Sequence, residues 1–200
     1  MIGVDRHGAF AEYLCAPARA TWRLPEGLGW KEAAYAEPLA ATLGVFRSGI
    51  LPEQVGWVMG SSRIALLTAR LLQRRGFAAG MGPLDDMEPN SLDYVVETGL
   101  QAHEVDHVLE VLKPGGALIA KSRHLGALPL PWSRLVRKDL RVQGLYYGGF
   151  AEALVLLGQA DVHELLVDLV GPAYELADWR AFVAPEEKES ERRKPFLVMD

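Results

Sequence analysis

The feature of the sequence that most constrains its fold is the apolar run 55–59, which breaks at Gly60 and resumes with helical spacing as far as Leu67. This pattern predicts a strand, a tight turn and a helix. In dinucleotide-binding folds the same junction carries the motif G-x-G-x-x-G, whose glycines make the turn, admit the pyrophosphate and seat the helix on the strand. Here Gly60 holds the first position, while Ser62 and Ala65 hold the second and third. The junction therefore predicts this architecture with an altered phosphate cradle.

Composition limits the class of protein. The chain has 200 residues, of which 50% are hydrophobic, and this is enough for a substantial core. The net charge of -5 argues against nucleic acid as a partner. A single cysteine, Cys15, excludes an internal disulfide and a CxxC zinc site and favours a reducing compartment. Neither a signal peptide nor a membrane-spanning run of about 18 apolar residues is evident. We therefore expect a cytoplasmic protein that binds neither nucleic acid nor membrane.

Strand-like and helical segments alternate after residue 55. Following the 55–59 strand, we expect helices near 64–75, 105–112, 132–138, 150–157 and 165–170, and strands near 92–98, 117–120, 140–147 and 195–199, with one short strand within 76–91. Before it we expect a strand over 9–16, a loop over 22–30 and a helical region over 31–49. This order predicts an α/β fold, a parallel sheet with helices on both faces.

Seven short motifs carry a resemblance that extends over nearly the whole chain. They are Gly-Ala-Phe-Ala-Glu-Tyr-Leu at 8–14, Leu-Pro-Glu-Gly-Leu at 24–28, Ala-Glu-Pro-Leu-Ala at 36–40, the strand-turn-helix at 55–72, Asp-Tyr-Val-Val-Glu-Thr-Gly at 93–99, Leu-Lys-Pro-Gly-Gly at 112–116, and Leu-Val-Arg-Lys-Asp-Leu-Arg at 135–141. In their order and spacing, these motifs resemble the zinc-type medium-chain dehydrogenases, the family of alcohol, sorbitol and threonine dehydrogenases.

The resemblance implies a GroES-like domain that holds catalytic zinc and a Rossmann domain that holds NAD or NADP, with the substrate between them. It places the first residues of this chain inside the GroES-like domain, so we expect a chain that is truncated at its N-terminus. The expected division is a catalytic-domain remnant over 1–46, a trimmed Rossmann-like domain over 47–183, and a C-terminal strand within 184–200 that returns to the remnant.

Two departures from the family pattern affect the expected cofactors. Of the family's zinc-related positions only Glu37 is present, and one carboxylate cannot supply the three ligands of a catalytic zinc, so we expect no zinc. The segment 76–91 has room for one strand only, because a parallel crossover needs a dozen or more residues. The ribose-binding acid, expected about 20 residues after the glycine turn, falls near Gly80, where no acid stands.

The resemblance and the turn together give the candidate cofactor site, whereas no catalytic residue is assigned. The expected cofactor is NAD or NADP, bound weakly or not at all. The predicted cofactor-binding residues are Gly60, Ser61, Ser62, Arg63, Ile64, Val95 and Ser122.

Other polar residues have both a functional and a structural interpretation. Glu37 is either a metal-site acid or an acid favoured by the dipole of a helix N-terminus. His103 and His107 are four residues apart, a spacing that suits either a metal or an exposed helix face. Cys15 is either a nucleophile or a core thiol. The structural interpretation is favoured for all of them, because no further ligand or base is identifiable in the sequence.

The sequence thus predicts an alcohol or polyol dehydrogenase-like NAD(P)-dependent oxidoreductase homologue that is zinc-free and impaired or inactive on its own. Two alternatives remain open. One is a noncatalytic scaffold that forms a homodimer through the strand at 140–148, which contains Tyr146 and Tyr147 and resembles the family's dimer edge. The other is a cleft beside Gly60, Val95 and Ser122 that binds a different small ligand.

Overall fold

The computed structural model describes residues 8–123, 126–183 and 193–198. The chain forms two compact units, which we call the sheet unit, residues 35–153, and the terminal unit, residues 1–34 with 154–200. These borders differ from those expected after residues 46 and 183. One reason is that α2 (Ala36–Leu43) packs against α3 (Arg63–Arg74) and so belongs to the sheet unit. The two units are described separately below.

The sheet unit contains a five-stranded parallel sheet. Its strands follow one another in space in the order β2-β1-β3-β4-β5. In chain order they are β1 (Val55–Met59), β2 (Ala78–Gly82), β3 (Leu92–Glu97), β4 (Leu112–Ala120) and β5 (Arg141–Gly144). This arrangement confirms the predicted Rossmann-like α/β class. It also confirms that a single strand occupies 76–91, so the described sheet has one strand beyond β1 on that side.

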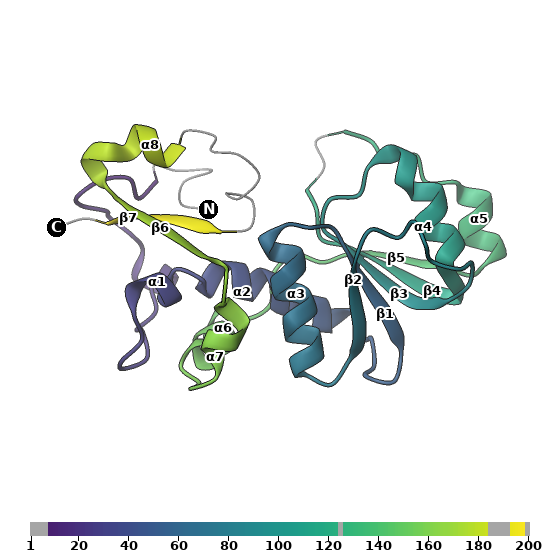
Figure 1. Ribbon diagram of the computed structural model, residues 1–200, viewed down its shortest axis with the longest axis horizontal. Coiled ribbons are helices and arrows are strands. Elements are labelled where there is room, and N and C mark those ends of the chain that lie inside the picture. The colour runs from purple at the N-terminus through teal and green to yellow at the C-terminus, as the bar shows by residue number, and fades with distance from the viewer. Residues whose placement is uncertain (1–7, 124–125, 184–192, 199–200) are drawn as a thin grey trace. The chain divides into compact units, whose positions relative to one another are not determined.

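Helices cover both faces of this sheet, as the alternating pattern predicted (Figure 1). One face carries α3, whose Ala65, Ala69 and Leu72 share a buried core with Val58 and Val96. The opposite face carries α4 (Val105–Val111) and α5 (Trp132–Arg137), which form a second buried core with strand residues. The unit also contains the 3₁₀ helices η2 (Gly44–Ser48) and η3 (Ala102–Glu104). Two apolar cores on opposite faces are what the near-continuous apolar strands require.

The helix α3 starts and stops where its sequence predicts. Ser62 caps its N-terminus by accepting a hydrogen bond from Ala65 N at 3.3 Å, and Arg74 lies in its last turn. Gly76 follows with φ +80°, a left-handed conformation that ends helices and that glycine adopts without strain. The bounds of α3 therefore agree closely with the predicted helix at 64–75.

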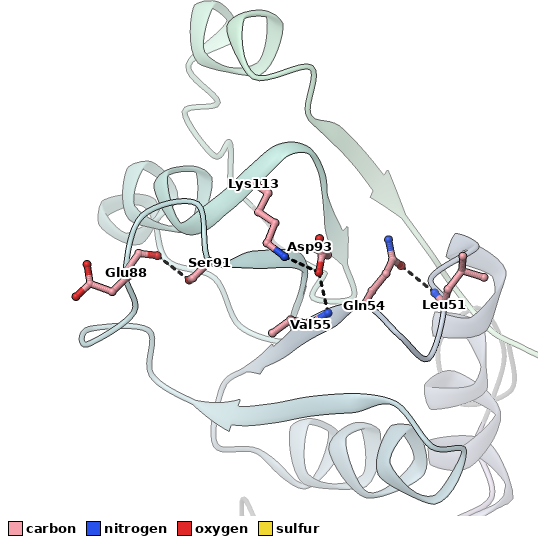
Figure 2. A network of polar contacts seen from close by, with 7 residues as sticks. All are labelled: Leu51, Gln54, Val55, Glu88, Ser91, Asp93 and Lys113. Carbon is pink, nitrogen blue, oxygen red and sulfur yellow. Dashed lines mark hydrogen bonds and ion pairs between the residues drawn. The ribbon is translucent and has the colours of Figure 1, made fainter.

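A polar network joins the amino ends of three neighbouring strands (Figure 2). Asp93 Oδ2, on β3, accepts hydrogen bonds from Val55 N at 2.8 Å and from Lys113 Nζ at 2.9 Å. Burial raises the pKa of Asp93, but the Lys113 hydrogen bond, the Val55 amide and the Lys113 charge outweigh it and hold the pKa below its ordinary value of 3.8. This carboxylate links β1, β3 and β4 at the amino ends of the strands.

The terminal unit contains short elements. They are η1 (Ala18–Ala20), α1 (Trp30–Ala33), α7 (Val162–Leu166), β6 (Val170–Glu175), η4 (Leu176–Asp178), α8 (Trp179–Val183) and β7 (Lys194–Val198), and the helix α6 (Phe150–Leu157) contains the border between the units. Strands β6 and β7 form a parallel pair. The expected terminal strand is therefore present, with β6 as its partner, while part of the segment 184–200 lies outside the described residues.

Two secondary-structure predictions are wrong. Residues 9–16 form no strand, and the apolar side chains Phe10 and Tyr13 are 66% and 90% exposed. The helix expected at 165–170 is displaced toward the N-terminus: α7 ends at Leu166, and Asp168 has φ +63°, which breaks the helix before β6 begins. Among the described helices, none has both the length and the apolar character to cross a membrane.

Candidate functional site

The turn after β1 is closed by a side chain from the turn after β3. Gly60 has φ +119°, a conformation that side chains of L residues rarely adopt. A Cβ at this position would lie only 2.4 Å from Thr98 Oγ1. Thr98 Oγ1 donates a hydrogen bond to Met59 O at 2.9 Å, and Thr98 N donates to the same oxygen at 3.1 Å. Gly60 is therefore required both by the backbone conformation and by the closeness of Thr98.

This turn lies at the point where the order of strands reverses. The chain leaves β1 toward β2 on one side, and β3 pairs with β1 on the other. In open α/β sheets, ligands bind outside the carboxyl ends of the strands at such a switch point, because the connecting loops diverge there. The carboxyl ends of β1 and β3 are thus the position that the topology favours for a ligand.

The N-terminus of α3 contributes backbone donors at the same place. The first N–H groups of a helix lack partners within the helix, and this end of the helix dipole favours anions. The Ser62 hydroxyl satisfies one of these groups, Ala65 N, and this leaves the amides of Arg63 and Ile64 without such a cap. Ser61 is exposed, and Ser62, Arg63 and Ile64 are half-buried. The turn therefore presents two backbone amides, those of Arg63 and Ile64, that can donate hydrogen bonds to one phosphate group.

A buried carboxylate organises the neighbouring loop. Glu97, at the carboxyl end of β3, is 1% exposed. Its Oε1 accepts hydrogen bonds from Lys121 N at 2.9 Å, Ser122 N at 3.0 Å and Ser122 Oγ at 2.9 Å, and its Oε2 accepts one from Leu100 N at 3.1 Å. Glu97 thus joins the loops after β3 and β4, and this holds Ser122 at the carboxyl ends of the strands.

The predicted site residues divide into two groups. Residues 60–64 lie together at the turn, and Ser122 lies on the neighbouring carboxyl edge, bound by Glu97. Val95 lies two residues before the end of β3, and its side chain is fully buried in the core that faces α4. Sequence reasoning missed Glu97 and Thr98 as organising residues. The available signal was an acid and a hydroxyl directly after the apolar pair Val95 and Val96.

The other candidates have structural contacts. Glu37 lies in the first turn of α2, as its structural interpretation predicts, and accepts a hydrogen bond from the Tyr147 hydroxyl. Burial, the Glu37 hydrogen bond and the Glu37 charge raise the pKa of Tyr147 to about 12. His103 is exposed on η3, and the His107 ring, on α4, bonds to Leu84 O at 2.8 Å. The described residues contain no group of three side chains suited to a metal.

The prediction of a core thiol at Cys15 is wrong. Cys15 is exposed, because the strand that would have buried it is not formed. Its exposure alone does not make it a nucleophile, since a reactive cysteine also needs a cationic or basic neighbour.

Comparisons with known proteins give relatives of one kind. No protein-family model matches the sequence. The L-threonine 3-dehydrogenase of Stenotrophomonas maltophilia (strain K279a) is 24% identical over 221 aligned residues, which cover 88% of this chain. The chain spans 64% of the length of this curated relative.

Solved structures share the fold. A protein described as a zinc-binding dehydrogenase, from Sinorhizobium meliloti 1021 and bound to NADP, superposes with a TM-score of 0.80 at 21% identity, and the match covers 98% of this chain and 68% of that one. The 2R,3R-butanediol dehydrogenase of Bacillus subtilis superposes with a TM-score of 0.71 at 17% identity, and the match covers 89% of this chain and 60% of that one. Together, the curated relatives and the shared fold confirm the predicted relation: the chain is a homologue of the zinc-type medium-chain dehydrogenases.

Proposed function

We propose that this protein binds a nicotinamide dinucleotide, NAD or NADP, at the Gly60 turn, as an alcohol or polyol dehydrogenase-like oxidoreductase homologue. The observation that carries the proposal is the junction itself. A glycine with φ +119° ends β1 at the switch point of the sheet, and a helix N-terminus with uncapped amides follows it. These features suit a pyrophosphate, which binds to helix N-termini through backbone amides and the dipole.

We propose that binding is weak, and two features of the turn support this. Ser62 places a side chain where dinucleotide-binding folds have their second glycine, and its hydroxyl is engaged with Ala65 N. The described sheet has only β2 beyond β1, so the adenosine side of the site has a single strand as its wall. A dinucleotide would therefore be held mainly through its pyrophosphate, by the amides of Arg63 and Ile64, with Ser122 at the neighbouring edge.

The fit of a catalytic zinc is poor in the described residues. Glu37 is the retained acid of the family's zinc region, and its carboxylate accepts a hydrogen bond from Tyr147. No second and third ligand accompany it among the residues that the structure describes. We propose that the described residues alone do not hold zinc, and that they are impaired in an alcohol oxidation that depends on a metal to polarise the substrate oxygen.

A noncatalytic dimer is the second candidate function, and the position of β5 supports it. This strand forms one edge of the described sheet, and its Val142 is 41% exposed. An unpaired strand with an exposed apolar residue is suited to pairing with the same strand of a second copy.

The cytoplasmic location stays a prediction from the single cysteine.

Calorimetric titration of the full chain with NADH and NADPH tests the main proposal. We expect binding of at least one dinucleotide with a dissociation constant of about 0.1 to 1 mM, equivalent to roughly 4 to 5.5 kcal/mol. The absence of heat from both dinucleotides at millimolar concentration would refute dinucleotide binding. In that case, the dimer would become the favoured function.

A further inference from the structure

Three cationic side chains of the sheet unit converge on the segment 145–147, which directly follows β5. Lys121 Nζ donates hydrogen bonds to two carbonyl oxygens of this segment, one of them at 2.9 Å. Arg47 Nη1, from η2, donates to the third carbonyl oxygen at 3.0 Å. The guanidinium carbon of Arg123 lies 5.4 Å from the ring centre of Tyr146. A short backbone segment thus gathers three positive charges from two parts of the sequence, Arg47 in one and Lys121 with Arg123 in the other.

No carboxylate among the described residues pairs with these cations. Lys121, Arg47 and Arg123 form no ion pair with a described residue. Two carboxylates lie in the same region, but each has other partners. Glu97 accepts hydrogen bonds from two backbone amides and a serine of the loop after β4, and Glu37 accepts one from a tyrosine hydroxyl. The three cations therefore form no ion pair within this part of the protein, and the charge of Glu97 offsets theirs only in part.

The electrostatic effect of this arrangement is visible at Lys121. Burial, then the charges of Arg123 and Arg47, lower the pKa of Lys121 to about 8, and Glu97 opposes the shift only in part. Like charges placed together disfavour the protonated form of a lysine. An anion bound among them would offset this repulsion.

The donors also have capacity left for a ligand. A lysine ammonium has three N–H groups, and two of those of Lys121 are used by backbone carbonyls. An arginine guanidinium has five, and Arg47 uses one of these in its hydrogen bond to Tyr147 O. Because Arg47 and Arg123 are exposed and Lys121 is half-buried, the cluster is open to solvent on its guanidinium side. Guanidinium groups bind phosphate and carboxylate through paired N–H donors.

We propose that Lys121, Arg47 and Arg123 form a binding site for a dianionic oxyanion group of a small ligand, either a phosphate ester or a pair of carboxylates. The backbone carbonyls at 145–147 hold Lys121 and Arg47 in place, and the ligand adds negative charge where Glu97 compensates the cations only in part. The cluster does not include the Gly60 turn, but Lys121 and Arg123 flank Ser122 of the proposed dinucleotide site, so its anion binding is tested without dinucleotide.

Titration of the full chain with sulfate and with malonate, in the absence of dinucleotide, tests this site. Ionic strength is kept constant with sodium chloride, so that general charge screening does not change. In two-dimensional amide NMR spectra we expect saturable shifts confined to residues around 121–123 and 145–148. Tighter binding of sulfate would assign the site to a phosphate ester, and tighter binding of malonate would assign it to a dicarboxylate. No saturable shift with either anion would overturn the proposal.

Variants distinguish this site from general surface charge. Arg47→Gln and Arg123→Gln should each weaken the binding of the preferred anion about three- to tenfold, because each removes one charged donor. Arg141→Gln is the matched control, since Arg141 is an exposed cation of the same unit outside the cluster, and it should leave binding unchanged. Equal weakening in all three variants would show non-specific attraction and contradict the site. Arg47 and Arg123 are exposed, so we expect both variants to fold with the hydrophobic core unchanged.

The pH dependence provides a second readout with sulfate, which does not titrate in this range. Lys121 loses its proton as the pH rises through about 8, and the site loses one of its charges. The Tyr147 hydroxyl stays protonated over this range, because its pKa is about 12. Sulfate binding should therefore weaken about threefold or more between pH 7 and pH 9.5. A Lys121→Met variant should bind weakly at both pH values, and a flat wild-type profile would contradict the role of Lys121.

Discussion

At the scale of single residues, Ser62 has two opposing roles. Its hydroxyl caps α3 through Ala65 N, and its side chain occupies the position at which a dinucleotide needs close approach of the backbone. Substitutions at Ser62 can distinguish the two roles. Replacing an N-cap serine by glycine lowers stability by only a few tenths of a kcal/mol, whereas replacing it by alanine lowers stability by about 1 kcal/mol. Ser62 thus determines whether the turn acts as a packing junction or as a cofactor site.

We predict that Ser62→Gly binds NADH more tightly than the wild type, by about three- to tenfold, with little change in stability. Ser62→Ala is the matched control: it should lose about 1 kcal/mol of stability without a gain in affinity. Calorimetric titration and urea unfolding measure the two effects. Unchanged or weaker binding by Ser62→Gly would show that Ser62 does not limit the cofactor site.

The hydroxyl of Tyr94 is buried and has no hydrogen-bond partner in the described part of the chain. Burial, with the Asp93 charge, raises the pKa of Tyr94 to about 12, so the group stays protonated at ordinary pH. An unsatisfied buried hydroxyl costs free energy that a phenylalanine avoids. This residue is therefore a source of instability within an otherwise apolar core.

We predict that Tyr94→Phe raises the free energy of unfolding by up to about 1 kcal/mol, measured by urea denaturation. Tyr13→Phe, at a site that is 90% exposed, should change it by less than about 0.5 kcal/mol. A loss of stability in Tyr94→Phe would mean that the hydroxyl has a partner, such as a buried water.

At the scale of elements, Asp93 joins the amino ends of β1, β3 and β4 through Val55 N and Lys113 Nζ. Its folded-state pKa lies below the ordinary value of 3.8. A carboxyl group with a lowered pKa stabilises the fold above its unfolded pKa, and this contribution is lost as the pH falls through the folded pKa. The contribution is therefore complete at neutral pH and disappears below about pH 3.8.

We predict that Asp93→Asn loses roughly 1 kcal/mol of stability at pH 7, and that the difference from the wild type shrinks as the pH falls below 4. Asp106→Asn is a suitable control, because its ion pair with Arg134 is long, at 3.5 Å, and its side chain is 73% exposed. That variant should show almost no effect. A difference for Asp93→Asn that is constant from pH 7 to pH 3 would contradict the role of its charge.

The elements also show what sequence could and could not predict. Apolar runs such as Val95 and Val96 predicted the strands of the sheet correctly, because a buried parallel strand is recognisable from its own residues. Alternation at 9–16 predicted a strand wrongly, because alternation does not supply a partner strand, and Phe10 and Tyr13 are exposed. Glu97 was missed as an organising residue, since three of its four side-chain hydrogen bonds come from the loop after β4, which is distant in sequence.

At the scale of the whole molecule, the exposed edge strand β5 is the basis for the proposed self-association. We predict a dimer in sedimentation velocity that Val142→Lys converts to a monomer, because the lysine charge would be buried between the edge strands. Leu51→Lys provides the control, since Leu51 is 50% exposed and lies just before β1, which is separated from β5 by β3 and β4. A wild-type protein that is monomeric at all concentrations would refute the dimer.

The fold of the sheet unit and the family relation were predictable from sequence, whereas the division into units was not. The motifs at 55–72, 93–99 and 112–116 are local and carry their own structure. The border near residue 34 depends on α2 packing against α3, and a contact between two helices is not encoded in either helix alone. The cation cluster at Lys121 likewise combines three segments that only the fold brings together.

Whether the Gly60 turn is a dinucleotide site can be tested by a crystal structure of the full chain grown with NADH. We predict a pyrophosphate at the amides of Arg63 and Ile64, with the dinucleotide lying along the carboxyl ends of β1 and β3. Electron density for NADH elsewhere on the protein, or a turn that remains closed by Thr98 without bound dinucleotide at saturating NADH, would contradict it.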